Sequence, residues 1–184
     1  MRIACWQALA FEDTTDMRLV MDILFHTPLD AQTQIACGIS EPAPLAMADQ
    51  VRFSELDVLH HVNNAVYLEW FERLRVRYTQ QFGLSRDFES NAGPRIVIRS
   101  GAIHYREEML LDEIYIVTCG CTAFRNTSFT MHQELWSDGR LRATFDCVLV
   151  LLRPDGSGRY PIPEKLRTHF QNSDGARDER GGTN

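Results

Sequence analysis

One long helix with an apolar face is the feature that most constrains how this chain folds. Between residues 64 and 82 apolar side chains recur every three or four positions: Val66, Trp70, Phe71, Leu74, Tyr78 and Phe82. That spacing places them on a single face and predicts one amphipathic helix, which Gly83 would end. Such a helix needs a second layer of structure to cover its apolar face.

After this helix the apolar pattern changes to a period of two residues. It predicts strands at 95–106, 112–124, 127–136 and 141–152. In the last stretch alternate apolar side chains share one face: Leu141, Ala143, Phe145, Cys147, Leu149 and Leu151. The Ser-Asp-Gly sequence at 137–139 predicts a hairpin, because aspartate and glycine tolerate positive φ. We therefore expect an α+β domain in which an antiparallel sheet wraps around the helix.

The composition predicts one globular domain with loosely packed ends. The chain has 184 residues, of which 44% are hydrophobic and 24% charged, as in an ordinary single domain. Residues 1–20 lack a steady period, so we expect a poorly packed N-terminal extension before a domain at 21–172. The polar stretch 173–184 predicts a flexible tail, and the two prolines within 40–46 predict an extended connector.

Net charge and cysteine content narrow the classes of partner. A formal charge of −6 gives no electrostatic reason to expect nucleic acid or an anionic membrane as a partner. No stretch approaches the roughly 20 apolar residues of a membrane span. The five cysteines are odd in number and lack a C-x-x-C pair, so we expect reduced thiols in a cytoplasmic protein.

Polar groups gather directly before the helix, in the sequence VRFSELDVLHHVNNAVYLEWFERLR at 51–75. Asn63 or Asn64 can cap the helix, because a short side-chain oxygen accepts hydrogen bonds from the first turn. The group of side chains that most resembles a set of metal ligands is Glu55, Asp57, His60 and His61. A catalytic turn explains this group better than a metal site does, so we expect no metal.

Over FSELDVLHHVNNAVYLEWFERLR the chain resembles the hotdog-fold acyl thioesterases of the 4-hydroxybenzoyl-CoA and acyl-CoA type. The pattern of that family runs acidic-x-Asp, a short turn, His-Val-Asn-Asn, then Tyr and an amphipathic helix. Over 94–153 the likeness is looser, with HYREEMLLDEIYIVT, FRNTSFTM and RATFDCVLVLLRPDG following the family's strands in order. The resemblance implies a single hotdog domain and a homodimer or homotetramer with active sites at the subunit boundary.

The resemblance also implies the site residues. The catalytic aspartate of the family falls on Asp57, the histidine of its His-Val-Asn-Asn segment falls on His61, and a further acid matches Glu108. Plant-type acyl carrier protein thioesterases have an asparagine between the first two, where this chain has Leu59. That version of the site is therefore incomplete.

Thioester hydrolysis needs a group that attacks the carbonyl or activates water, and donors for the oxyanion. Asp57 can be that group, and the free N–H groups of the helix start can be the donors. The expected substrate-binding residues are Asn63, Asn64, Ala65, Val66 and Tyr67. His61 can orient Asp57, protonate the leaving thiolate, or only hydrogen-bond within its loop.

Each of these residues also has a purely structural explanation. Asp57 can form an Asx turn, and Glu108 can belong to a solvated strand end. The segment Arg125-Asn126-Thr127-Ser128 can contact the phosphates of coenzyme A or simply form a hairpin turn. There is no G-x-S-x-G motif and no cysteine beside a histidine, which disfavours a serine or cysteine acyl-enzyme.

The leading hypothesis is an acyl-CoA thioesterase that acts through Asp57 without cofactor or metal. One alternative is a thioesterase for acyl groups on acyl carrier protein, which the negative net charge mildly disfavours because carrier proteins are acidic. The other is a catalytically silent hotdog dimer that binds acyl thioesters or a protein. Asp57 weighs against the silent dimer, and Leu59 weighs for it.

Overall fold

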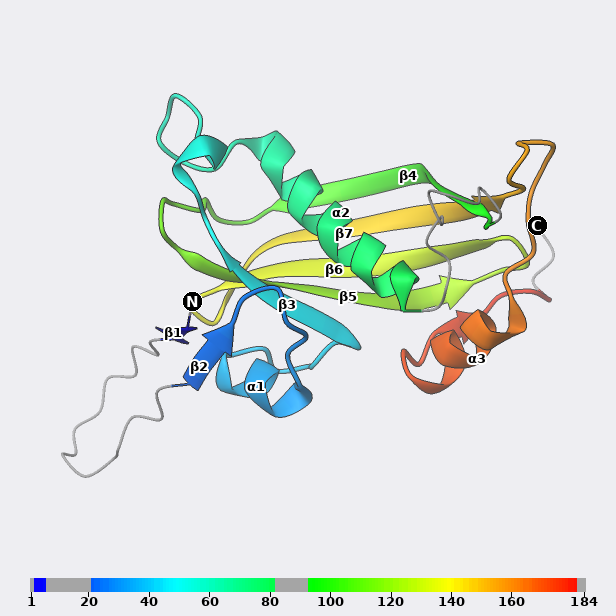
Figure 1. Cartoon of the computed structure of the whole chain (residues 1–184), viewed down its shortest axis with the longest axis horizontal. Coiled ribbons are helices and arrows are strands. Elements are labelled where there is room, and N and C mark those ends of the chain that lie inside the picture. The colour runs from blue at the N-terminus through cyan, green and yellow to red at the C-terminus, as the bar shows by residue number, and fades with distance from the viewer. Residues whose placement is uncertain (1, 6–20, 82–92, 182–184) are drawn as a thin grey trace.

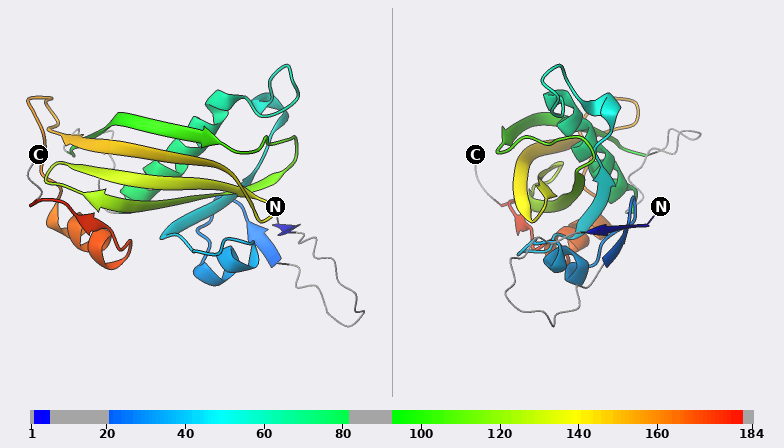
Figure 2. Two further views of the ribbon diagram at one scale, coloured as in Figure 1. Left: turned by 180° about the vertical axis from the view of Figure 1, so that it is seen from behind. Right: turned by 90° about the vertical axis from the view of Figure 1, so that its left-hand side faces the viewer.

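A computed structural model of the protein describes residues 2–5, 21–81 and 93–181. The elements, in chain order, are β1 (Arg2–Cys5), β2 (Met21–Leu24), α1 (Ala31–Ala36), β3 (Leu45–Gln50), a 3₁₀ turn (Phe53–Glu55), α2 (Asn64–Gln80), β4 (Arg95–Tyr105), β5 (Ile114–Phe124), β6 (Ser128–Ser137), β7 (Arg140–Leu152), α3 (Glu164–Asn172) and β8 (Arg177–Asp178). The main sheet has the antiparallel order β3-β5-β6-β7-β4, and β8 adds to it by pairing parallel with β5. It curves around α2, as Figure 1 and the right-hand view of Figure 2 show. The expected α+β hotdog domain is confirmed.

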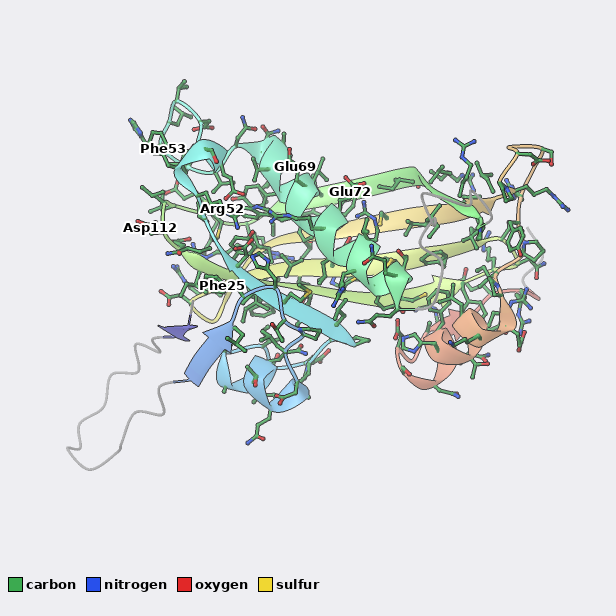
Figure 3. The ribbon with its side chains drawn as sticks, viewed as in Figure 1. Phe25, Arg52, Phe53, Glu69, Glu72 and Asp112 are labelled. Carbon is green, nitrogen blue, oxygen red and sulfur yellow. The ribbon has the colours of Figure 1, made fainter. Side chains whose placement is uncertain are left out.

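Helix α2 fills the inside of the curved sheet with the predicted apolar face. Trp70, Phe71, Leu74 and Tyr78 are buried against the inner face of the sheet. Complete burial of a side chain such as Phe71 or Leu74 contributes roughly 1.5–3 kcal/mol. Figure 3 shows Glu69 on the other, exposed side of the helix. The helix ends at Gln80, and the predicted stop at Gly83 lies outside the described residues.

One charged residue of α2 lies on its buried face. The sequence pattern places Arg75 among the polar residues of the helix, but this side chain is only 5% exposed. Its Nη1 donates to Oε1 of Gln133 at 3.0 Å, and Nε2 of Gln133 donates to the Phe71 carbonyl at 2.8 Å. Position 75 follows Phe71 by four residues, so helical geometry directs it toward the sheet. A polar partner from β6 makes the buried cation tolerable.

Strands β4, β5, β6 and β7 lie where the period of two predicts them. Strand β3 was not predicted: it overlaps the end of the expected connector at 40–46 and continues beyond it. Strand β3 is buried on both faces, which hides the alternation. Its outward Ala46 and Ala48 pack with Ile23, Cys37 and Ile39 from the N-terminal segment, in a second apolar cluster. A strand covered on both sides loses the alternation of apolar and polar residues that reveals a half-buried strand.

The expected tail at 173–184 contains residues that contact the sheet. The side chain of Asp174 is fully buried; its carboxylate accepts hydrogen bonds from the Tyr78 hydroxyl and, at 2.7 Å, from the Cys121 N–H. Residues 177–178 then form β8. Asp174 is therefore packed against the rest of the domain, because a buried tyrosine and a strand N–H both use it as their acceptor. The flexibility of 173–184 stays a prediction.

The expected N-terminal extension is only partly described. Residues 2–5 form β1, which pairs antiparallel with β2 in a separate two-stranded sheet. Residues 6–20 lie outside the described part of the chain. The boundary predicted at residue 21 therefore stays a prediction.

Candidate active site

A tight turn before α2 brings Asp57 and His61 together. The Asp57 N–H donates to the His61 carbonyl at 2.9 Å, and the His60 N–H donates to the Asp57 carbonyl at 3.1 Å. His60 has a φ of 63°, in the left-handed region that a reversal of this kind requires. As a result, His61 Nδ1 lies 3.4 Å from Asp57 Oδ2.

The two oxygens of the Asp57 carboxylate have different partners. Its Oδ1 accepts the Leu59 N–H at 2.8 Å, which is the Asx turn that the structural explanation predicts. Its Oδ2 is the oxygen that faces His61. The side chains of Asp57 and His61 are 25% and 30% exposed, so a substrate or a water molecule can reach them. The turn therefore presents an oriented carboxylate and an imidazole at the surface.

The start of α2 follows this turn directly. Asn63 is the N-cap: its side-chain oxygen accepts the Ala65 N–H at 3.0 Å. Asn63, Asn64 and Ala65 are exposed, whereas Val66 is half-buried and Tyr67 belongs to the core. The five expected substrate-binding residues are thus divided between an exposed first turn and the packed helix behind it.

Tyr67 helps to hold the helix start in place. Its ring packs edge-on against Tyr105 of β4, with centroids 5.1 Å apart, and the Tyr105 hydroxyl donates to the Asn64 carbonyl at 2.9 Å. Burial raises the pKa of Tyr67 to about 12, so its hydroxyl stays neutral at physiological pH. Tyr67 can donate a hydrogen bond but does not supply a charge.

Glu108 lies in the loop between β4 and β5, beside the Asp57 turn. The next residue, Met109, accepts the Val62 N–H at its carbonyl, at 2.9 Å. The Glu108 side chain is exposed. The backbone carbonyl of Glu108 accepts a hydrogen bond from Arg142 Nη1 at 3.0 Å. The fold thus brings the segments of Asp57, His61 and Glu108 together.

Two further residues support this arrangement, and neither is among the predicted catalytic or substrate-binding residues. Arg142 is buried and holds the Glu108 loop: it also donates to Glu107 Oε2 at 3.1 Å and to Glu113 Oε1 at 3.4 Å. Glu55 accepts the Trp70 indole N–H at 3.0 Å, and its carbonyl accepts the Asn63 N–H at 2.9 Å. Arg142 bridges segments that are distant in sequence, so no local pattern reveals it. Glu55 is the acid of the acidic-x-Asp pattern, but its bond to Trp70 depends on the fold.

The segment 125–128 lies elsewhere. It forms the turn between β5 and β6, at the opposite end of the sheet from the loop that precedes α2 (Figure 1). The Arg125 N–H donates to the Ser128 carbonyl at 2.7 Å, and Arg125 Nε is 3.2 Å from Glu179 Oε2. Within this chain the segment is a hairpin turn and is not part of the Asp57 site.

The described residues show neither a metal-ligand group nor a membrane-spanning helix. They contain no group of three or more His, Cys, Asp or Glu side chains that could hold a metal ion. Within the same ranges, every helix is too short or too polar to cross a membrane.

A sheet curved around one helix, with an aspartate and a histidine in the turn before it, defines the hotdog thioesterase class of fold. A thioesterase superfamily protein from Jannaschia sp. CCS1 is 40% identical to this chain, with a TM-score of 0.77, covering 83% of this chain and 97% of that one. A thioesterase from Thermus thermophilus, solved with coenzyme A and Zn, is 30% identical, with a TM-score of 0.63, covering 73% and 97%. A Staphylococcus aureus protein solved in complex with CoA is 19% identical, with a TM-score of 0.65, covering 70% and 84%, and shows a likeness of fold alone. No curated protein matches the sequence.

The family model of the thioesterase-like superfamily matches residues 51–170, which include the Asp57 turn, α2 and the main strands. The chain belongs to this superfamily. The match to this family supports thioester hydrolysis as the general activity of the protein.

Proposed function

We propose that this protein hydrolyses acyl-CoA thioesters, with Asp57 as the base or nucleophile. The observation that carries the proposal is the position of Asp57 Oδ2, which is partly exposed and faces His61 Nδ1 at 3.4 Å directly before the exposed first turn of α2. A thioester carbonyl near backbone N–H groups of this turn would be polarised while the carboxylate attacks it or activates water. Coenzyme A in the Thermus thermophilus relative supports CoA as the carrier of the acyl group.

His61 and Glu108 complete the proposed chemistry. His61 would orient Asp57 or protonate the leaving thiolate, since its imidazole is partly exposed and beside the carboxylate. Glu108 would contribute a second acid, because its segment is joined to the Asp57 turn through the Met109–Val62 hydrogen bond. No cofactor is needed for either role.

The test is a panel of aliphatic and aromatic acyl-CoA substrates, with release of free thiol followed colorimetrically. Asp57→Asn keeps the size of the side chain but removes its charge, so turnover should fall at least ~10²-fold while binding changes little. Asp155→Asn is a matched control, because Asp155 also forms an Asx turn, with its Oδ1 accepting the Ser157 N–H at 2.9 Å. The control variant should keep full turnover.

The outcomes separate the alternatives. Normal turnover in Asp57→Asn with a large loss in Glu108→Gln would move the base to Glu108. Turnover with acyl carrier protein substrates alone would favour the carrier-protein thioesterase. Binding without hydrolysis of any thioester by the parent protein would favour the silent dimer.

We also propose a homodimer joined through β4. Residues 26–29 cover the edge of β3: the His26 and Leu29 N–H groups donate to the carbonyls of Ala48 and Ala46 at 3.1 and 2.9 Å. Strand β4 pairs with β7 on one side and with no other described strand. Ile98 of β4 is 46% exposed, and an open apolar edge favours pairing with a second copy.

Sedimentation of the whole chain at micromolar concentration tests the dimer. Ile98→Glu should shift it toward monomer, because like charges of two copies would then meet across the joined edges. Ile35→Glu is the control, since Ile35 is 57% exposed on α1, away from β4. A monomer that hydrolyses thioesters would contradict a site shared between subunits.

The cytoplasm is the proposed location. Cys119, Cys121 and Cys147 are free and buried. Unpaired thiols of this number are typical of a reducing compartment.

A further inference from the structure

A cavity lies between α2 and β3. Its volume is about 360 Å³, within the usual range of small-molecule sites. Buried side chains of Trp70, Leu74 and Val117 line its apolar interior, together with Met47. Neither Asp57 nor His61 belongs to its lining. The cavity is therefore lined by residues other than the proposed catalytic pair.

The one carboxylate in the lining is already neutralised. Asp49 is 6% exposed, and Arg52 Nη2 donates to both of its oxygens, at 2.9 and 3.0 Å. Arg73 Nη1 donates to Asp49 Oδ2 at 3.1 Å, and the Tyr115 hydroxyl approaches the same oxygen at 3.4 Å. Figure 3 shows Arg52 where β3 approaches the first half of α2. Two arginines around Asp49 mean that it does not leave the cavity negative.

Two further basic residues, His26 and Arg77, also line the cavity, and both are exposed. Arg77 makes no ion pair with any residue in the described ranges. His26 Nε2 is 3.7 Å from Asp49 Oδ1. The backbone of His26 has a φ of 60°, a conformation that costs free energy in a residue other than glycine. The hydrogen bond from its N–H to the Ala48 carbonyl holds the residue in this position beside the cavity.

We propose that this cavity binds apolar monocarboxylates. The carboxylate would lie at Arg77, with His26 nearby, and the hydrocarbon body would lie against Trp70, Leu74 and Val117. Arginine is suited to this role because its guanidinium pairs with both oxygens of a carboxylate. The apolar interior favours a hydrocarbon body over a sugar or a nucleotide, and a fatty acid of about eight carbons suits a cavity of this class.

Calorimetric titration of the whole protein with sodium octanoate tests the site. We expect a Kd of about 1 mM or tighter, and octanol should bind at least about tenfold more weakly because it lacks the charge. Arg77→Glu should weaken octanoate binding at least about tenfold, since it replaces attraction by repulsion. Arg153→Glu makes the same change of charge at an exposed arginine that does not line the cavity, and it should leave binding unchanged.

The position of the bound acid can be read independently from the indole N–H of Trp70 in nuclear magnetic resonance spectra, assigned with Trp70→Phe. This signal should shift on addition of octanoate to the parent protein and to Arg153→Glu, and stay in place in Arg77→Glu. Equal weakening by both arginine variants would show general charge attraction and overturn the proposal. Unchanged binding in Arg77→Glu, a stationary Trp70 signal, or no binding up to about 10 mM would overturn it as well.

Discussion

Replacing Arg142 by methionine should destabilise the Glu108 loop, which supports the proposed active site. Arg142 is 4% exposed, and its loss leaves the Glu108 carbonyl without the donor at 3.0 Å. An acceptor left unpaired in this way costs about 1–3 kcal/mol. The side chains of Glu107 and Glu113 are 41% and 25% exposed, so they rehydrate, and each adds at most about 1 kcal/mol. The expected loss of unfolding free energy is about 2–4 kcal/mol, or about 5–15 °C in Tm.

The matched control for Arg142→Met is Arg140→Met. Arg140 pairs with the same Glu107 oxygen at 2.9 Å, but its side chain is 57% exposed, so its loss should cost less than about 1 kcal/mol. Urea unfolding measures both variants. Hydrogen exchange at Val62, whose N–H bonds to Met109 in the loop, should speed up about tenfold for each 1.4 kcal/mol lost locally. Equal small losses in the two variants, with unchanged exchange at Val62, would refute this account of Arg142.

Two other predictions concern the outer face of the sheet and the N-terminus. Hydrogen bonds from His132 to Glu134 and Asp146 raise the pKa of His132 from 6.5 to about 9. Because this pKa is higher in the folded state, its stabilisation is complete below pH 6.5 and is lost as the pH rises through about 9. His132→Gln should therefore destabilise the protein at about pH 6 but not at about pH 10, as urea unfolding would show. Deleting residues 1–20 should lower the free energy of unfolding by less than about 1 kcal/mol, because the deletion removes the short, four-residue strand β1. A drop in Tm above about 4 °C would contradict this prediction.

Local periodicity predicted the elements whose two faces meet different surroundings. Helix α2 was predictable because one side meets the sheet and the other meets solvent, and β7 was predictable from its alternating apolar face. Strand β3 was not, because the N-terminal segment covers its outer face and both faces are apolar. Asp174 was not predictable either, since its neighbours in sequence are polar and its partners, Tyr78 and Cys121, are far away along the chain.

The sequence alone determined the Asp57–His61 pair and the helix cap, because their contacts join residues at most four positions apart. Only the tertiary structure decided what surrounds them. Met109 contacts Val62, and Arg142 holds the Glu108 loop, through contacts between residues that are 29 or more positions apart. The same holds for the cavity between α2 and β3, whose lining comes from four separate segments. Local backbone geometry sets the contacts between residues that are close in sequence. Long-range contacts depend on the order in which the strands pair, and a local sequence pattern does not contain that order.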